Sequence, residues 1–462
     1  MFTKTIAAAI LSAFLFSCNQ SGGGSSGAKG GIDPSEFSGR PGDCKEFIAS
    51  LPSTYFHDWL SVPENPFDPS GLQINVFYYG PNQLDKDLVL FYNGGPGSDS
   101  HGTMGHLEPG LTENNLQSRL SFVYMDQRGT GCSSAYPSAR TDADILRSRW
   151  YGSTGIVYDS EALRTKLIGQ RKWKVFGQSY GAFIVHRYAA LFPTSLEAGY
   201  AHANTLNEDP ELRLYNRIFS QYRVVNLFLE KYPEDRAKLL TLKTFLSPQK
   251  CFQTQFVGNV CGHEVIEGLV SYVGFSNRWE QLHKRINLMV PGLAPNLMTS
   301  EEAIKSFVSA VIDVEEAPTG FALSVISYYD RNVSTGDYTS CGPIYTKLAA
   351  QGITEDQLLI NECMLSIQTK RISTSSQRIR TVLNNTHDHL TLEKLKAGLV
   401  QMNAKSFFLY SGEKDAFVPK ESFPEEVSYL GDLINYTHFM NSGHEGYRTE
   451  KQVWGDLGKA FN

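Results

Sequence analysis

The stretch at residues 173–192 constrains this chain most, because three structural signals follow one another there without a gap. A buried strand is expected to end near Phe176, and the pentapeptide G-Q-S-Y-G at 177–181 follows directly. The apolar spacing over 182–192 predicts a helix. A turn this tight forces Ser179 into a strained backbone conformation and leaves no room for side chains at the two glycines. The sequence therefore predicts a serine hydroxyl raised clear of a sheet, at the start of a helix.

A serine displayed in this way is the nucleophile elbow of an α/β-hydrolase. Its hydroxyl is a weak nucleophile at neutral pH, so it needs a histidine base and an acid that orients the histidine. In that fold, the acid and then the histidine follow the serine along the chain. Asp415 comes just after the expected strand 406–410, and His444 just after the expected strand 434–440. We therefore expect Ser179, Asp415 and His444 to form a catalytic triad at the carboxyl ends of strands.

The rest of the chain fits an α/β architecture. Apolar runs such as Leu88–Tyr92 and Leu120–Met125 are typical of strands buried on both faces of a mostly parallel sheet. We predict an α/β-hydrolase fold with helices on both faces of the sheet and a large helical cap inserted before the last strands. The expected parts are a core at 43–205 and 399–462 and a cap at 206–398. The expected cap helices are Leu214–Leu229, Glu264–Val273, Glu301–Ile312 and Glu355–Ser366.

Two expectations concern local structure in the core. Asp43–Leu60 is interpreted as an amphipathic opening segment. Asp159–Leu167 is predicted to be a helix that Ser160 caps at its N-terminus.

The oxyanion of an acyl-transfer reaction needs fixed N–H donors. One is expected to be the backbone N–H of Tyr180, directly after the nucleophile. The other is expected in the N-G-G-P-G loop at 93–97, where Gly94 and Gly95 let the backbone approach a substrate closely. The alternative is a glycine-rich turn that does not contact substrate.

The N-terminus predicts export. Residues 1–17 contain an apolar run too short to span a bilayer. Residues 15–18, L-F-S-C, resemble a bacterial lipobox, in which Cys18 becomes the lipidated N-terminus. The Ser/Gly-rich segment within 18–42 is expected to be a flexible tether. We expect a lipoprotein anchored to a membrane and facing the periplasm or the cell exterior; ordinary cleavage and secretion is the alternative.

Charge and composition limit which classes of partner and cofactor are expected. The net charge is −6 and no long basic run occurs, so nucleic-acid binding is disfavoured. His387 and His389 suggest a metal pair, but no further ligands accompany them at site-like spacing. We expect no metal and no cofactor.

Cysteine usage agrees with export. Without Cys18, six cysteines remain, and an even number in an exported protein suggests disulfides. Proximity in the sequence favours Cys251–Cys261 and then Cys341–Cys363, which leaves Cys44 with Cys132. Free buried thiols are the alternative.

Several motifs together resemble one family. They are N-G-G-P-G at 93–97, D-Q-R-G-T-G-C-S at 126–133, G-Q-S-Y-G at 177–181, Asp415, and G-H at 443–444. This set resembles the prolyl aminopeptidase (prolyl iminopeptidase) family, which includes secreted tripeptidyl aminopeptidases. The resemblance implies a serine exopeptidase that removes N-terminal residues, often proline, from peptides through an acyl-enzyme.

The chain departs from the family pattern in two places. Asn93 stands where the family usually has histidine, and Ala182 stands where a last glycine often follows the elbow. With Asn93, the N-G-G-P-G motif also resembles that of serine carboxypeptidases, which pair it with G-E-S-Y-G. In this chain, Gln178 replaces the glutamate of the second motif. The D-Q-R-G block favours the aminopeptidase interpretation. A carboxylesterase with the same machinery is the other alternative.

An aminopeptidase must bind a free α-ammonium group, which needs carboxylates close by in a partly dry cleft. The resemblance implies that acidic residues of the cap do this. Trp279-Glu280 resembles the family's Trp-Glu cap motif, and Glu315-Glu316 is a second acidic pair. Glu108 and Glu445 are weaker candidates.

Overall fold

The structure is a computed structural model that describes residues 44–460 with internal gaps. The gaps are 138–140, 207–209, 247–250, 254–258, 293–298, 312–324, 327–329, 331–341, 361–372, 385–386 and 403–404. The expected signal peptide and tether therefore lie outside the described residues. The same is true of several residues singled out above: Cys18, Glu315, Glu316, Cys341 and Cys363.

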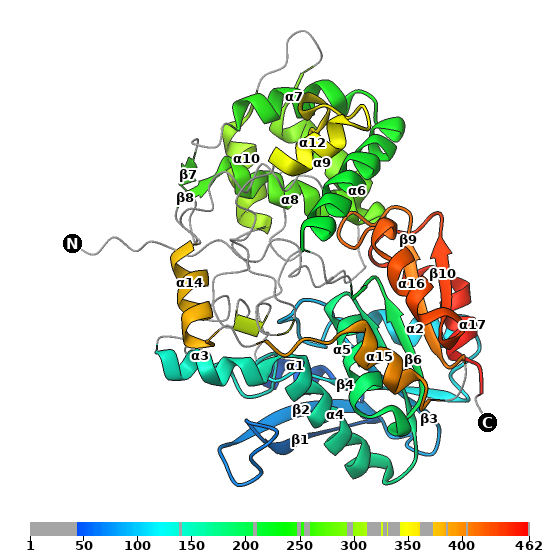
Figure 1. The fold of residues 1–462 in the computed structure, drawn as a ribbon. Coiled ribbons are helices and arrows are strands. Elements are labelled where there is room, and N and C mark those ends of the chain that lie inside the picture. The colour runs from blue at the N-terminus through cyan, green and yellow to red at the C-terminus, as the bar shows by residue number, and fades with distance from the viewer. Residues whose placement is uncertain are drawn as a thin grey trace.

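An eight-stranded sheet forms the centre of the fold, in the order β1-β2-β4-β3-β5-β6-β9-β10 (Figure 1). The strands are β1 (Tyr55–Pro63), β2 (Gln73–Pro81), β3 (Asp87–Tyr92), β4 (Leu120–Met125), β5 (Trp173–Gln178), β6 (Leu196–His202), β9 (Phe407–Gly412) and β10 (Asn435–Phe439). Strand β2 pairs antiparallel with β1 and β4, and all other neighbours are parallel. The predicted mostly parallel sheet is confirmed.

Helices cover both faces of the sheet. They are α1 (Cys44–Ser50), α2 (Met104–Glu113), α3 (Asp142–Ser148), α4 (Ser153–Ile168), α5 (Tyr180–Leu191), α15 (Leu392–Leu399), α16 (Pro424–Leu430) and α17 (Lys451–Leu457). Successive residues of a strand point to opposite faces. Leu90 of β3 therefore lies in a core cluster with residues of α4 and α5, whereas Phe91 lies in a cluster with residues of α2 and α17. This two-sided burial explains the uninterrupted apolar runs of β3 and β4.

A second group of helices lies between β6 and α15 in the chain. They are α6 (Pro210–Lys231), α7 (Asp235–Phe245), α8 (Gly262–Gly274), α9 (Trp279–Met289), α10 (Glu301–Val311), α12 (Gly342–Ala349) and α14 (Ser373–Val382). Figure 1 shows most of them in a lobe above the sheet. The lobe has its own apolar core, which includes Phe228, Leu269 and Ile286. The boundaries proposed for this cap, 206 and 398, stay a prediction.

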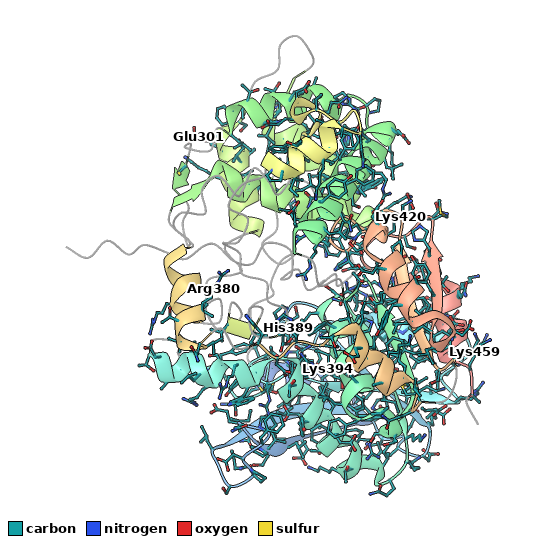
Figure 2. All side chains as sticks on the ribbon, viewed as in Figure 1. Glu301, Arg380, His389, Lys394, Lys420 and Lys459 are labelled. Carbon is teal, nitrogen blue, oxygen red and sulfur yellow. A yellow bond between two sulfur atoms is a disulfide. The ribbon has the colours of Figure 1, made fainter. Side chains whose placement is uncertain are left out.

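Side chains fill the interior of both parts, as Figure 2 shows. Charged residues such as Glu301 of the cap and Lys459 near the C-terminus lie at the periphery, with about half of each side chain exposed. Over the described ranges, no helix combines the length and apolar character needed to cross a bilayer.

Within the predicted opening segment 43–60, residues 55–60 belong to β1, because this aromatic-rich strand pairs along its whole length with β2. Two local expectations were wrong. Ser160 lies inside α4, where its hydroxyl donates to the Ile156 carbonyl, and Gly152 occupies the N-cap. The expected helix Glu355–Ser366 begins instead with a single 3₁₀ turn, η5 (Glu355–Gln357), closed by a capping box, and its residues 361–366 lie outside the described residues.

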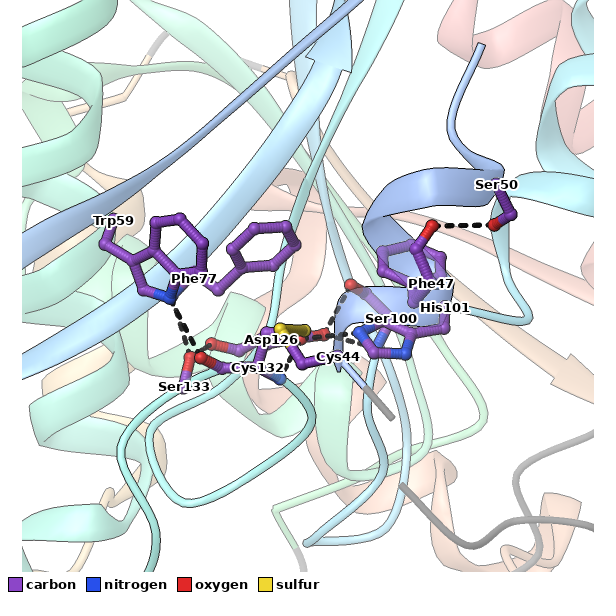
Figure 3. The surroundings of a disulfide bond; sticks show 10 residues. All are labelled: Cys44, Phe47, Ser50, Trp59, Phe77, Ser100, His101, Asp126, Cys132 and Ser133. Atoms are coloured by element: carbon purple, nitrogen blue, oxygen red, sulfur yellow. Dashed lines mark hydrogen bonds and ion pairs between the residues drawn. A yellow bond between two sulfur atoms is a disulfide. The ribbon is translucent and has the colours of Figure 1, made fainter. Parts of the chain in front are cut away.

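The disulfide predicted between Cys44 and Cys132 is present, with 5.3 Å between the Cα atoms (Figure 3). It joins α1 to the loop after β4. Cys251 is also disulfide-bonded. It lies opposite Cys261 in the antiparallel ribbon of β7 (Cys251–Gln253) and β8 (Asn259–Cys261), in agreement with the favoured pairing.

Candidate active site

Ser179 occupies the single residue between the end of β5 and the start of α5. Its backbone has φ 57° and ψ −120°, a combination that side-chain-bearing residues rarely adopt. The Ser179 N–H donates to the His202 carbonyl at 2.9 Å, and the Ser179 carbonyl accepts from the Phe183 N–H at 3.2 Å. The strained turn expected from the pentapeptide is therefore present and held from both sides.

Glycine is required at positions 177 and 181 because a Cβ atom there would clash with backbone atoms. A Cβ atom at Gly177 would lie 2.2 Å from the Gly181 carbonyl oxygen, and one at Gly181 would lie 2.1 Å from the Tyr92 carbonyl oxygen. Backbone atoms packed in a sheet cannot move away as a flexible side chain can. Glycine at both positions therefore allows α5 to pack directly against the sheet.

Asp415 and His444 lie beyond the ends of β9 and β10, as expected, and they form a buried pair. The Nδ1 atom of His444 is 2.8 Å from Oδ2 of Asp415. The other carboxylate oxygen, Oδ1, accepts from the N–H groups of Phe417 and Val418 at 2.8 and 2.9 Å. With both oxygens engaged, the carboxylate fixes the orientation of the imidazole and leaves its Nε2 atom for proton transfer.

Gln178 connects the elbow to the histidine. Its Nε2 atom donates to the His444 carbonyl at 3.0 Å. Its Oε1 atom lies 2.8 Å from the position that a Cβ at Gly94 would take. One side chain thus spans the loop after β3, the nucleophile turn and the loop after β10. In the sequence, Gln178 serves only as a family marker, and no local pattern predicts this connection.

The described residues show no direct hydrogen bond between the Ser179 hydroxyl and His444, whose ring bonds to Asp415. Catalytic hydrogen bonds are often long in the absence of substrate and shorten in the Michaelis complex. The structure thus supplies an oriented imidazole and a strained serine at the same edge of the sheet, beyond the ends of β10 and β5. The complete triad stays a prediction.

The backbone around Ser179 offers N–H groups for an oxyanion. Tyr180 is the first residue of α5, and the first N–H groups of a helix have no partner within the helix. A Cβ at Gly94 would lie 3.2 Å from the Ser179 Cβ, so this loop adjoins the nucleophile. Gly95 has φ +113°, which favours glycine strongly. Tyr180, Gly94 and Gly95 therefore remain the expected oxyanion residues.

Replacing Gly94 by alanine is expected to lower kcat by about 10²–10³-fold, the usual effect of losing an oxyanion donor. The added methyl group would press on Gln178 and on the Ser179 side chain, so the loop must shift away from the nucleophile. Steady-state kinetics would measure the loss. Gly105→Ala is the matched control, because a Cβ there meets nothing within 4 Å. A Gly94→Ala variant with wild-type kcat would contradict the assignment.

Side chains of the D-Q-R-G motif at 126–129 hold the loop after β3 in place. Asp126 accepts from the N–H and hydroxyl of Ser100 at 2.9 and 2.7 Å and from the Cys132 N–H at 2.8 Å. His101 contacts the same carboxylate at 2.8 Å (Figure 3). The Gln127 side chain donates to the Asn93 carbonyl at 3.0 Å. These contacts hold the loop in place and explain why the two motifs occur together.

Arg128 of the same block has a structural role. Its guanidinium makes two 2.7 Å hydrogen bonds to Asp159 and also reaches the carbonyls of Glu64 and Trp150. Asn93, which replaces the family's histidine, hydrogen-bonds through its side chain to the Asp99 carbonyl and the Thr103 hydroxyl. The substitution therefore keeps the loop folded.

Asp330 is a buried partner of Tyr180 that the sequence did not reveal. The Tyr180 hydroxyl donates to Oδ2 of Asp330 at 2.6 Å, and the Ser153 N–H donates to the same oxygen at 2.7 Å. Burial raises the pKa of Asp330, and Arg187 at 3.9 Å opposes this effect. The contact fixes the side chain of the residue that directly follows Ser179. Asp330 is 150 residues away from Tyr180, so no local pattern could indicate it.

His202 lies at the end of β6, close to His444. It is fully buried, and neither ring nitrogen has a hydrogen-bond partner among the described residues. Its Nε2 atom is 3.2 Å from the position of a Cβ at Gly446, two residues after His444. Burial, with a smaller effect of His444, lowers the pKa of His202 to about 3.

This neutral histidine predicts acid sensitivity. Below pH 6.5 the unfolded chain binds a proton at His202 that the folded protein does not, so stability is lost as the pH falls. We expect the free energy of unfolding to fall between pH 6 and 4 by about 1.4 kcal/mol per pH unit from this group. Urea unfolding at several pH values would measure it. His202→Gln should give a shallower dependence; an unchanged slope would contradict the prediction.

The candidates for binding the substrate amine differ in their surroundings. Glu280 was expected in a partly dry cleft, but its side chain is 70% exposed and pairs with Lys284 at 2.8 Å. The interpretation of Glu280 as a desolvated amine ligand is therefore corrected: the pair is an i,i+4 contact on the surface of α9. Glu108 and Glu445 are more buried, and burial raises the pKa of each. Trp279 packs in the cap core.

Comparison with known proteins agrees with this geometry. Residues 87–236 match the family described as alpha/beta hydrolase fold. A proline iminopeptidase of Aspergillus aculeatus is 28% identical over 217 residues, which cover 42% of this chain and 47% of the relative. A proline iminopeptidase of Aeromonas sobria is 29% identical over 179 residues, covering 36% and 40%. The chain thus spans less than half the length of these curated relatives.

Among solved structures, the proline iminopeptidase of Mycobacterium smegmatis aligns with 86% of this chain and 95% of its own, with a TM-score of 0.40 and 13% identity. The α/β-hydrolase fold is instead indicated by the strand order, the turn at Ser179 and the sequence matches. The chain has an α/β-hydrolase fold and is similar in sequence to the proline iminopeptidases.

Proposed function

We propose that this protein is a serine aminopeptidase that hydrolyses N-terminal residues, including proline, from peptides. The observation that carries the proposal is the buried Asp415–His444 pair, joined through Gln178 to the strained turn at Ser179. Peptide substrates follow from the relatives named proline iminopeptidase. The match covers less than half of each of those relatives. The preference for proline is therefore a separate and more specific part of the proposal than the aminopeptidase activity.

In the proposed mechanism, Ser179 attacks the scissile carbonyl and His444 accepts its proton. The N–H groups of Tyr180 and Gly95 stabilise the oxyanion. His444 then protonates the leaving amine, and Asp415 keeps the imidazole oriented throughout. Water repeats the attack on the acyl-enzyme, with His444 again as the base. The mechanism requires no metal or cofactor.

A comparison of substrates tests the activity. Prolyl- and alanyl-naphthylamides, the same compounds with an acetylated amine, and simple short esters are offered to the wild-type protein and to Ser179→Ala. We expect hydrolysis of the free-amine compounds and little activity on the acetylated ones. Labelling by a fluorophosphonate probe should require Ser179. Activity on the esters alone would favour a carboxylesterase, and release of C-terminal residues would favour a carboxypeptidase.

We also propose that the protein is exported and anchored by a lipid at Cys18, on the basis of the lipobox-like sequence at 15–18. Growth with labelled palmitate followed by membrane fractionation tests this proposal. Label on the wild-type protein and its loss in Cys18→Ser would support the anchor. An unlabelled protein recovered in the medium would indicate ordinary secretion.

A further inference from the structure

Arg278 carries a positive charge in a buried position. It ends the short turn η4 (Ser276–Arg278) between α8 and α9, and only 8% of the residue is exposed. Its guanidinium lies over the Phe275 ring, 4.6 Å from the centroid. In the described part of the chain, no carboxylate lies within ion-pair distance of it and it donates no side-chain hydrogen bond. Proteins rarely bury a charged group without a partner, because the loss of hydration is costly.

The turn that carries Arg278 packs directly on the loop of the catalytic histidine. The His444 N–H donates to the Gly274 carbonyl at 3.2 Å. The Phe275 ring meets the His444 ring edge-on, with 5.5 Å between centroids. A Cβ at Gly443 would lie 3.0 Å from the Ser276 N atom. Arg278 is therefore held beside His444, with Phe275 between the two side chains.

A second guanidinium adds to the positive charge. Arg448 follows His444 by four residues and lies 3.5 Å from Glu445, the carboxylate that faces it. Burial and the nearby charge of Arg448 lower the pKa of Arg278 to about 10, so Arg278 stays charged at neutral pH. Burial and Arg448 also lower the pKa of His106 to about 4. Arg448 thus has Glu445 as its partner, whereas Arg278 has no carboxylate among the described residues, and the region beside His444 has an excess of positive charge.

The chemistry of the reaction indicates which part of the substrate meets this charge. In the proposed function, on which this inference rests, His444 protonates the leaving amine, so the leaving group must lie on the His444 side. The leaving group of a short peptide bears a free C-terminal carboxylate. A guanidinium presents paired N–H donors that match a carboxylate.

We propose that Arg278, together with Arg448, binds the C-terminal carboxylate of the leaving group, so that the enzyme prefers short peptides with a free carboxyl end. A carboxylate there would supply the partner that Arg278 lacks and neutralise the excess charge. The role is one of substrate binding and specificity, and it is distinct from the capture of the amine at the opposite end of the substrate.

Pairs of substrates that differ only at the C-terminus test this proposal. Each pair is a dipeptide and its C-terminal amide, with the N-terminal residue that the naphthylamide comparison selects. We expect the wild-type kcat/KM to be at least about tenfold higher for the free acid, mainly through KM, as for a hydrogen bond to a charged group. In Arg278→Gln the ratio of acid to amide should fall to about one, and Arg278→Lys should keep part of it.

Lys284→Gln is the matched control, because it removes a positive charge from an exposed position on the next helix; its ratio should equal that of the wild type. If Arg278→Gln does not fold, the acid-to-amide ratio of kcat/KM in the wild type and in Arg448→Gln still tests the inference. Equal kcat/KM for acid and amide in the wild type, or an unchanged ratio in folded Arg278→Gln, would overturn the inference. Hydrolysis of esters but of neither dipeptide would instead contradict the proposed aminopeptidase function.

Discussion

Alanine in place of Ser179 is expected to lower kcat by about 10⁶-fold, because loss of a triad nucleophile leaves only substrate binding and the oxyanion donors. The fold should persist, since Ser179 is held through its backbone, by the His202 carbonyl and the Phe183 N–H. Kinetics with the best naphthylamide substrate, together with circular dichroism, would measure both properties. Residual activity above about one-hundredth of wild type would mean that another residue is the nucleophile.

Replacing Ser179 by glycine gives an independent test of the backbone strain at this position. The φ of +57° at Ser179 is strained for any residue with a Cβ, including alanine, but not for glycine. Ser179→Gly and Ser179→Ala should therefore be equally inactive. Glycine should be more stable than alanine by about 1 kcal/mol, since relief of the strain exceeds the entropic cost of glycine. Equal free energies of unfolding would indicate that the turn stores no strain.

Asn in place of Asp415 is expected to reduce kcat by about 10⁴-fold. In the wild type, Oδ1 accepts from the N–H groups of Phe417 and Val418, and Oδ2 faces His444. An asparagine must keep its oxygen toward the two backbone donors, so its NH₂ group would face Nδ1 of His444. That arrangement favours the imidazole tautomer with the proton on Nε2, which cannot accept the serine proton.

The matched control for this variant is Asp432→Asn, which changes an exposed aspartate on the turn before β10. It should retain wild-type kinetics. A pH–rate profile adds a test: raising the pH should not restore Asp415→Asn to wild-type rates, because the wrong tautomer persists. Activity of Asp415→Asn within tenfold of wild type would show that a different carboxylate orients His444.

The parts of the site that the sequence predicted are those that depend on local chain geometry. A strand, a G-x-S-x-G turn and a helix require one backbone conformation, so the strain at Ser179 could be expected from five residues. The positions of Asp415 and His444 follow from the rule that parallel strands end at the same edge of a sheet. The apolar runs of β3 and β4 identified the buried centre of the sheet, because both of their faces are covered.

The parts that the sequence did not predict depend on contacts between distant segments. The bonds from Gln178 to His444 and from Tyr180 to Asp330 join residues 266 and 150 positions apart, and none of these residues has an unusual local pattern. Strand β1 was missed because its pairing with β2, and not its own alternation, determines its conformation. Glu280 was misinterpreted because a short motif does not show which side of a helix faces solvent.

The link between Cys44 and Cys132 closes a covalent ring of the chain, with its ends 88 positions apart. A protease that nicks the polypeptide once anywhere inside that ring leaves both pieces attached, and the sheet strands within it stay tied to the enzyme. The same link ties the first residue of α1, at the N-terminal end of the described residues, to the loop after β4. If the proposed lipid at Cys18 is present, tension on the N-terminal segment would act on this covalent link as well as on the short helix α1.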